Sequence, residues 1–264
     1  MARQAVEALL EVAQEPASSA EELLARLVDA GRKLAAARPA MGGITHAVGR
    51  LVASAQTASG LRPDDLQRLV VEEGNALIGS RDRAAASIAV HLGPVLDEAT
   101  VLTHSASATV REAVLRTPPA RIFCTASAPF EEGRAFAEDL AAEGLEAELV
   151  EDDEVKRALE TASLVLVGAD TVYEDGSVKN KIGTRPLAEA ARDVGVRTLV
   201  ACELLKIVPV ACPGGEDEPD LRDTTPPDLV EEIVTEEGST EPEHVKSLIE
   251  RTPFLRDGYQ LLRA

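Results

Sequence analysis

Leu164-Val165-Leu166-Val167-Gly168-Ala169-Asp170 combines a short apolar run with a carboxylate directly behind it. The run predicts a buried strand, so that Asp170 lies just past its carboxyl end. A turn is expected at Asp175-Gly176, after which Asn180-Lys181-Ile182-Gly183-Thr184 leads into a helix. Ligands of open α/β sheets bind outside the carboxyl ends of strands, and helix N-termini attract phosphate. The segment therefore predicts a docking place for a phosphorylated small molecule.

Short β-branched runs recur through the second part of the chain. They fall at residues 100–103, 121–125, 146–150, 164–167 and 197–201, and helical patterns such as 131–143 and 186–194 alternate with them. This alternation is typical of βαβ units, whose strands form a mostly parallel sheet. We therefore predict an α/β fold with a mostly parallel sheet for residues 97–264.

Residues 1–96 show helical periodicity instead. Apolar residues recur at helical spacing from Ala5 to Leu34, and Ser18-Ser19 followed by two acids predicts an N-cap. Another helix is expected from near Gly43, and residues 64–92 predict one or two more. Because no alternating strand pattern occurs here, we expect a helical N-terminal domain over residues 1–96.

The chain is strongly acidic, with a formal net charge of −19 and only six lysines in 264 residues. Such a surface repels nucleic-acid phosphates, so we expect no direct nucleic-acid partner. The acids are spread along the chain, which favours adaptation to high salt over an acidic patch for a basic partner. A halophilic archaeon is the expected source, with a GC-rich bacterium as the alternative.

The cysteines and histidines show no metal-site pattern. Cys124, Cys202 and Cys212 are odd in number and widely separated, and the four histidines lack ligand spacing. We expect no disulfide framework, no metal and no cofactor. No apolar run is long enough to span a bilayer, and the start lacks the apolar region of a signal peptide. A cytoplasmic protein without membrane contact is expected.

Five blocks together carry a resemblance to a known family. Besides residues 164–184 they are residues 101–107, 202–206, 223–230 and 233–238. Taken in their order along the chain, these blocks resemble the family of the α, β and δ subunits of translation initiation factor 2B. That family includes ribose-1,5-bisphosphate isomerase and methylthioribose-1-phosphate isomerase. The resemblance implies a helical N-terminal domain followed by a Rossmann-like domain.

By the resemblance, Asp170 matches a catalytic residue of the family, whereas Ser105 departs from one. Asp170 matches the aspartate that acts as acid and base in the isomerases of the family. Ser105, in Thr103-His104-Ser105, stands where those isomerases have a catalytic cysteine. A serine hydroxyl is a far poorer base than a thiolate without an adjacent partner. His104 is no such partner, because neighbours on a strand point to opposite faces. The serine therefore argues against cysteine-dependent isomerase chemistry.

Further residues match positions that hold substrate phosphate in the family. Asn180, Lys181 and Lys206 match directly. Ser107 and Thr109 lie at the expected start of a helix, where they either bind a second phosphate or act as ordinary caps. Gly42-Gly43 occupies the place of a glycine-rich phosphate contact, although the residues before it depart from the family pattern. We expect these seven residues to form the substrate-binding site.

Three functions follow from these observations. The main interpretation is an initiation factor 2B-like protein that binds a phosphorylated ribose or a nucleoside monophosphate without the usual catalytic cysteine. The first alternative is an aldose–ketose isomerase that converts ribose 1,5-bisphosphate to ribulose 1,5-bisphosphate. The second is a non-catalytic regulatory or interaction subunit. Whether the protein is an enzyme stays open at this point.

The resemblance also implies a homodimer or a higher homo-oligomer, assembled largely through the C-terminal domain. Apolar positions in residues 223–237, namely Leu229, Val230, Ile233 and Val234, suit an isologous contact. The same positions would serve equally well inside their own domain.

Overall fold

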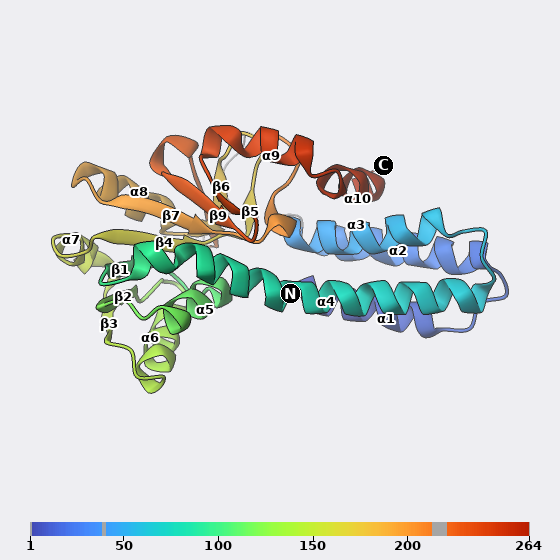
Figure 1. Ribbon diagram of the computed structural model, residues 1–264, viewed down its shortest axis with the longest axis horizontal. Coiled ribbons are helices and arrows are strands. Elements are labelled where there is room, and N and C mark those ends of the chain that lie inside the picture. Colours follow the sequence, from blue (N-terminus) through green and yellow to red (C-terminus); the bar gives the residue numbers. More distant parts are fainter. Residues whose placement is uncertain (1, 39–40, 213–220, 264) are drawn as a thin grey trace. The chain divides into compact units, whose positions relative to one another are not determined.

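The computed structural model describes residues 2–38, 41–212 and 221–263 (Figure 1). The chain forms two compact units. The helical unit comprises residues 1–83, 205–209 and 247–264, and the sheet unit comprises residues 84–204 and 210–246. An acidic loop suggested by the sequence, residues 214–220, lies outside the described residues. In the described part of the chain, no helix is long and apolar enough to cross a membrane.

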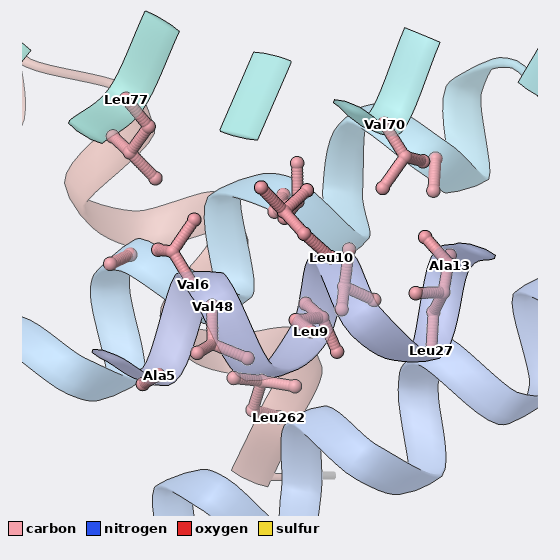
Figure 2. Close-up of a cluster of buried hydrophobic side chains, with 14 of the residues drawn as sticks. Ala5, Val6, Leu9, Leu10, Ala13, Leu27, Val48, Val70, Leu77 and Leu262 are labelled. Carbon is pink, nitrogen blue, oxygen red and sulfur yellow. The ribbon is translucent and has the colours of Figure 1, made fainter. Parts of the chain in front are cut away.

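The helical unit is built from antiparallel and crossing helices around one apolar core. Its elements are α1 (Ala2–Gln14), α2 (Ala20–Ala37), α3 (Gly42–Thr57), the first part of α4 (Pro63–Leu96) and α10 (Phe254–Arg263). Leucine, valine and alanine fill the core, and Figure 2 shows Leu9, Leu27, Val48 and Leu262 among its side chains. Ser19 caps α2 by accepting a hydrogen bond from the amide of Glu22, as predicted.

The sheet unit contains a seven-stranded sheet in the order β10-β9-β7-β4-β1-β2-β3. Its strands are β1 (Thr100–Thr103), β2 (Arg121–Thr125), β3 (Ala147–Val150), β4 (Leu164–Gly168), β7 (Arg197–Ala201), β9 (Glu232–Thr235) and β10 (Gly238–Thr240). All neighbouring pairs are parallel except β9 and β10. This confirms the predicted α/β class with a mostly parallel sheet.

Strand order places a switch point at the middle of the sheet. From β1 the chain moves outward through β2 and β3, and it then returns to β4 on the other side of β1. The crevice outside the carboxyl ends of β1 and β4 is where open α/β sheets bind ligands. Ser105 follows β1 and Asp170 follows β4, so both predicted catalytic residues are next to this crevice.

Helices cover both faces of the sheet. Alternate strand residues, such as Val101, Leu164 and Leu166, share a core with the end of α4, α5 (Ala108–Arg116) and α6 (Glu132–Ala142). In Figure 1, α5 and α6 lie on one side of the strands and α8 (Thr184–Asp193) lies on the other. The short helix α7 (Val155–Leu159) also belongs to the sheet unit, whereas α9 (Val245–Arg251) begins in the sheet unit and continues in the helical unit.

The sheet unit also contains a second, three-stranded antiparallel sheet, whose strands come between those of the large sheet in the sequence. It consists of β5 (Thr171–Val172), β6 (Val178–Lys181) and β8 (Arg222–Thr225), in the order β5-β6-β8. Asp175 accepts a hydrogen bond from the amide of Ser177, and Gly176 has φ 83°, so the expected turn joins β5 to β6. The sequence pattern did not predict these short polar strands.

The structure divides the chain differently from the predicted division at residue 96. Residues 64–92 form part of a single helix, α4, which contributes to both units. Leu205–Pro209 and α10 belong to the helical unit although they come late in the chain. Buried His46 on α3 explains why, since its ring nitrogens lie 2.9 Å and 2.8 Å from the carbonyl oxygens of Leu205 and Leu255.

The apolar residues proposed for a dimer contact are buried within the chain itself. Leu229 and Val230 are each 6% exposed, and Ile233 and Val234 on β9 are 0% and 2% exposed. Because β9 pairs with β7 on one side and β10 on the other, these side chains serve the core of the sheet. The expectation that they face a second copy is therefore wrong, and the oligomer stays a prediction without this surface.

Candidate functional site at the sheet switch point

The loops after β1 and β4 meet at the switch point. Ser107 follows β1, and a Cβ atom placed on Gly168 at the end of β4 would lie 2.5 Å from the Ser107 hydroxyl oxygen. Only glycine permits this close approach of the two loops. The loops that carry Ser105 and Asp170 are thus in direct contact.

Ser105 adopts a strained backbone conformation at this point. Its φ is 65°, and Ser127 (φ 66°) and Glu131 (φ 53°) on the loop after β2 are also left-handed. For residues other than glycine this region costs roughly 1–2 kcal/mol each. The amide of Ser105 donates to the hydroxyl oxygen of Ser127 at 2.7 Å, so the strained residues support one another. Such clustering is characteristic of functional sites.

His104 is a structural residue beneath this loop. Its Nε2 lies 2.7 Å from the carbonyl oxygen of Ile182, which can only accept, so Nε2 carries the proton. Nδ1 then accepts from the hydroxyl of Thr125 at 2.7 Å. Burial lowers the pKa of His104, which keeps the ring neutral. The side chain is not paired with Ser105, in agreement with the opposite orientation of strand neighbours.

The hydroxyl of Ser105 is bound to a carboxylate instead. It donates to Glu132 Oε1 at 2.7 Å, and Lys181 Nζ lies 3.1 Å from both Glu132 oxygens. Burial raises the pKa of Glu132, but the bonds from Ser105 and Lys181 outweigh it and leave the pKa below its ordinary value. Phe130 covers the ammonium, with its ring centroid 4.7 Å from Nζ.

Asp170 has a cation of its own. Its Oδ2 accepts from Arg222 Nε at 2.6 Å, and the side chain remains 26% exposed. Arg222 on β8 is the register partner of Lys181 on β6. Directly opposed residues of an antiparallel pair point to the same face. Two neighbouring cations therefore hold two carboxylates, Asp170 and Glu132.

The start of α8 is already occupied by a protein carboxylate. Asp223 accepts from the amide of Gly183 at 2.8 Å and from that of Arg185 at 3.1 Å. These are the amides that an incoming phosphate would use at a helix N-terminus. The expectation that this helix start binds substrate phosphate is therefore not supported, because Asp223 satisfies it.

Asn180 is likewise committed to local structure. It is 8% exposed, and its amide donates to the hydroxyl of Thr184, which in turn donates to the carbonyl of Lys181. This chain of bonds fixes the turn between β6 and α8. Lys181, not Asn180, is the residue of the pair that faces other functional groups.

Ser107 and Thr109 act as parts of helix α5. Ser107 is its N-cap and accepts from the amide of Val110 at 3.3 Å. Thr109 is only 2% exposed, so its hydroxyl is not presented to a ligand. The structure favours capping and packing over the predicted phosphate contacts for these side chains.

The remaining predicted residues lie together in the helical unit. Gly42 and Gly43 begin α3, where no side chain caps the helix and no acid occurs in the first turn. A Cβ on Gly43 would lie 3.4 Å from Lys206 Cγ. Lys206 makes no ion pair with the described residues. Gly43 and Lys206 are thus neighbours within the helical unit.

Sequence reasoning missed Glu132, Arg222 and Phe130. Glu132 and Arg222 come from segments whose local pattern shows only acids at a helix start and a polar stretch. For Phe130 the sequence offered one signal, its being one of only four phenylalanines in the chain; the structure leaves its side chain 67% exposed.

A separate cavity of about 640 Å³ lies in the sheet unit. Its walls are largely apolar and include His104, Pro129, Pro186 and Leu187, with Asp153 and Lys156 also among the lining residues. The residues that line this cavity do not include Ser105, Glu132, Asp170 or Lys181. It is therefore distinct from the paired cations and carboxylates.

Comparison with known proteins places this site in context. The model of the initiation factor 2 subunit family matches residues 1–224. The chain is 31% identical to ribose 1,5-bisphosphate isomerase from Haloferax volcanii, over 88% of this chain and 80% of that protein. It is 27% identical to methylthioribose-1-phosphate isomerase from Syntrophotalea carbinolica, over 88% and 79%.

Among solved structures, translation initiation factor eIF-2B from Pyrococcus horikoshii has a similar fold. The TM-score is 0.79 at 25% identity, with 91% of this chain and 90% of the other covered. The similarity extends over both units of the chain.

Proposed function

The chain belongs to the initiation factor 2 subunit family, and we propose that it is an aldose–ketose isomerase that acts on ribose 1,5-bisphosphate. The relative from Haloferax volcanii carries that activity in its name and is similar over most of both chains. The product would be ribulose 1,5-bisphosphate. This was the alternative interpretation of the sequence, and the relatives support it better than binding alone.

One observation carries the proposal within the structure. At the switch point, the neighbouring cations Lys181 and Arg222 hold the carboxylates of Glu132 and Asp170 beside the hydroxyl of Ser105. Isomerisation moves a proton between adjacent carbons of a sugar that carries two anionic phosphate groups. It therefore needs acid–base groups together with cations that stabilise negative charge as it develops.

Each residue then has a distinct task. Lys181 and Arg222 attract the phosphorylated substrate into an otherwise acidic protein and stabilise an enolate-like intermediate. Asp170, which is 26% exposed on its side chain, exchanges protons with substrate oxygen.

A second candidate function is binding of a phosphorylated ribose or a nucleoside monophosphate without turnover. It is favoured by Ser105, which stands where the isomerases of the family have cysteine. It is also favoured by the bonds that already engage the Ser105 hydroxyl. A protein of this kind would retain the cations Lys181 and Arg222, which bind the anionic ligand, but would not catalyse isomerisation.

Calorimetry and a turnover assay separate these functions. Ribose 1,5-bisphosphate, AMP and ribose 5-phosphate are titrated in high salt, and formation of ribulose 1,5-bisphosphate is followed in parallel. We expect ribose 1,5-bisphosphate to bind below millimolar concentration and to be converted. Lys181→Ala should weaken binding at least tenfold, whereas Lys246→Ala, at an exposed position, should not. Binding without conversion would favour the second function, and no binding of any ligand would refute both.

A further inference from the structure

Glu132 places a carboxylate directly beside Ser105. It is the first residue of α6, its carboxylate touches the hydroxyl of Ser105, and its side chain remains 29% exposed. A carboxylate that served only to hold Lys181 in place would need no contact with the strained residue after β1. The exposure leaves one side of the group available to a small molecule.

Serine cannot supply the missing base on its own. The hydroxyl of Ser105 points its proton at Glu132 Oε1 at 2.7 Å, so the oxygen of the carboxylate is the stronger acceptor of the pair. Carboxylates are common general bases, whereas an unassisted serine hydroxyl is a poor one. The chain therefore carries a base at the place where cysteine is absent, one hydrogen bond away.

We propose that Glu132 is the general base of the isomerisation, with Ser105 and Lys181 as positioning residues that orient its carboxylate. This inference rests on the proposed function, because it assigns a role within the same reaction. The hydrogen bond from Ser105 and the contact with Lys181 fix both oxygens of the carboxylate. The strained φ of 65° at Ser105 aims the hydroxyl at this acceptor.

The proton transfers balance without any other reactant. Glu132 takes the proton from C2, the electron pair of that bond forms a C1–C2 double bond, and the ring bond from C1 to oxygen breaks. The ring oxygen gains a proton, and the C2 hydroxyl later releases one as the ketone forms. Asp170, whose carboxylate pairs with Arg222, is the candidate to take the proton of the C2 hydroxyl, and an equivalent proton reaches the ring oxygen from solvent. Glu132 finally returns its proton to C1, so substrate and product have the same composition.

The alternative is a purely structural ion pair that anchors α6 to β6. In that case Glu132 would matter for folding and for the shape of the site, and a small carboxylate added from solution would not replace it. Chemical rescue separates a lost base from a lost structural contact. The cavity left by Glu132→Ala lies beside Lys181, whose ammonium is suited to hold formate.

The test measures turnover of ribose 1,5-bisphosphate by wild type, Glu132→Gln, Glu132→Ala, Ser105→Ala and the control Glu138→Gln, which lies at an exposed position of α6. We expect both Glu132 variants to lose about 100-fold or more in kcat, since a general base contributes typically that much. Their affinity for the substrate, measured by calorimetry, should change less than tenfold. Glu138→Gln should match wild type.

Formate should raise the rate of Glu132→Ala at least tenfold, while the same concentration of chloride, or formate added to Ser105→Ala, should not. Wild-type turnover that survives in Glu132→Gln within threefold would overturn the inference and leave the proposed function intact. The inference is also overturned if Glu132→Ala is folded, binds substrate, and shows no rescue. A wild type that binds the substrate without converting it would instead refute the proposed function.

Discussion

Lys181 Nζ lies 3.1 Å from both carboxylate oxygens of Glu132, and this ion pair joins strand β6 to helix α6. The lysine side chain is 9% exposed and that of the glutamate 29%. Removing the glutamate therefore leaves a more deeply buried charge than removing the lysine. The pair determines the geometry at the end of β1, because the same carboxylate receives the hydroxyl of Ser105.

We predict that the two charges are coupled in stability. Glu132→Met should lower the free energy of unfolding by about 2–3 kcal/mol and Lys181→Met by about 1–2 kcal/mol, because each leaves its partner unpaired. The double variant should cost clearly less than the sum, since neither charge then remains. Urea unfolding of all four proteins provides the double-mutant cycle. Strictly additive losses would show that the contact contributes nothing.

Catalysis should respond to Asp170 and Ser105 in opposite directions. Asp170→Asn should lower the isomerisation rate by on the order of 100-fold, because its amide cannot exchange protons near neutral pH. Ser105→Cys should raise the rate, because a thiolate would add a second base beside Glu132, which the serine hydroxyl cannot provide. Product formation is measured with Asp193→Asn, exposed at the end of α8, as the control. If wild type turns over as fast as a typical metabolic enzyme and Ser105→Cys does not change the rate, Ser105 fully replaces the cysteine of the related isomerases.

The sequence was sufficient for five of the seven strands of the large sheet, because these are apolar and β-branched, but it did not predict β9 and β10. All five predicted runs are strands, and 164–167 and 146–150 differ from β4 and β3 by a single residue at one end. It was insufficient for β5, β6 and β8, which are short and polar and exist because they pair with one another at the site. Local pattern contains no signal for such mutual support.

The same reason limited the prediction of the site. Asp170 and Lys181 are close in sequence to the strand that presents them, and they were identified. Glu132 meets Lys181 across 49 residues, and Arg222 meets Asp170 across 52. Those contacts depend on tertiary structure. The capping carboxylate of Asp223 could not be foreseen either, since only the fold brings β8 to the start of α8.

Stability should also depend on pH through Glu236. Its carboxylate lies in the turn between β9 and β10, where burial raises its pKa although the amide of Leu204 donates to it. The folded state therefore prefers the protonated form. Stability from this group is complete below the ordinary glutamate pKa and is lost as pH rises through the raised value. Glu236→Gln removes the loss.

The free energy of unfolding of Glu236→Gln should thus exceed that of wild type by an amount that grows from pH 4 to pH 7. Urea titrations across this range, with exposed Glu237→Gln as the control, measure the difference. A difference that is constant with pH would show that Glu236 has the same pKa in the folded and unfolded states.

We further expect a homo-oligomer in solution, as the family resemblance implies. The apolar residues of β9 are excluded as its interface because the sheet buries them. Light scattering across a wide range of salt gives the mass directly. A dimer or larger species should persist from moderate to high salt. A monomer at every salt concentration would refute the expectation.

Gly183 should be among the least replaceable residues near the site. It has φ 101°, and a Cβ atom there would lie 2.7 Å from Cε1 of His104, whose ring is fixed by Thr125 and Ile182. Gly195 provides the matched control, since its φ is 75° but nothing lies within 4 Å of its Cβ position. Alanine at Gly195 should cost about 1 kcal/mol from backbone strain alone. At Gly183 the clash adds to that strain, so we expect a loss at least about 1 kcal/mol larger by urea unfolding.

Displacement of His104 should also disturb the loop of Ser105 and lower turnover. Equal losses at the two glycines would mean that the His104 ring moves aside freely, and the rigid support inferred for the Ser105 loop would then be wrong.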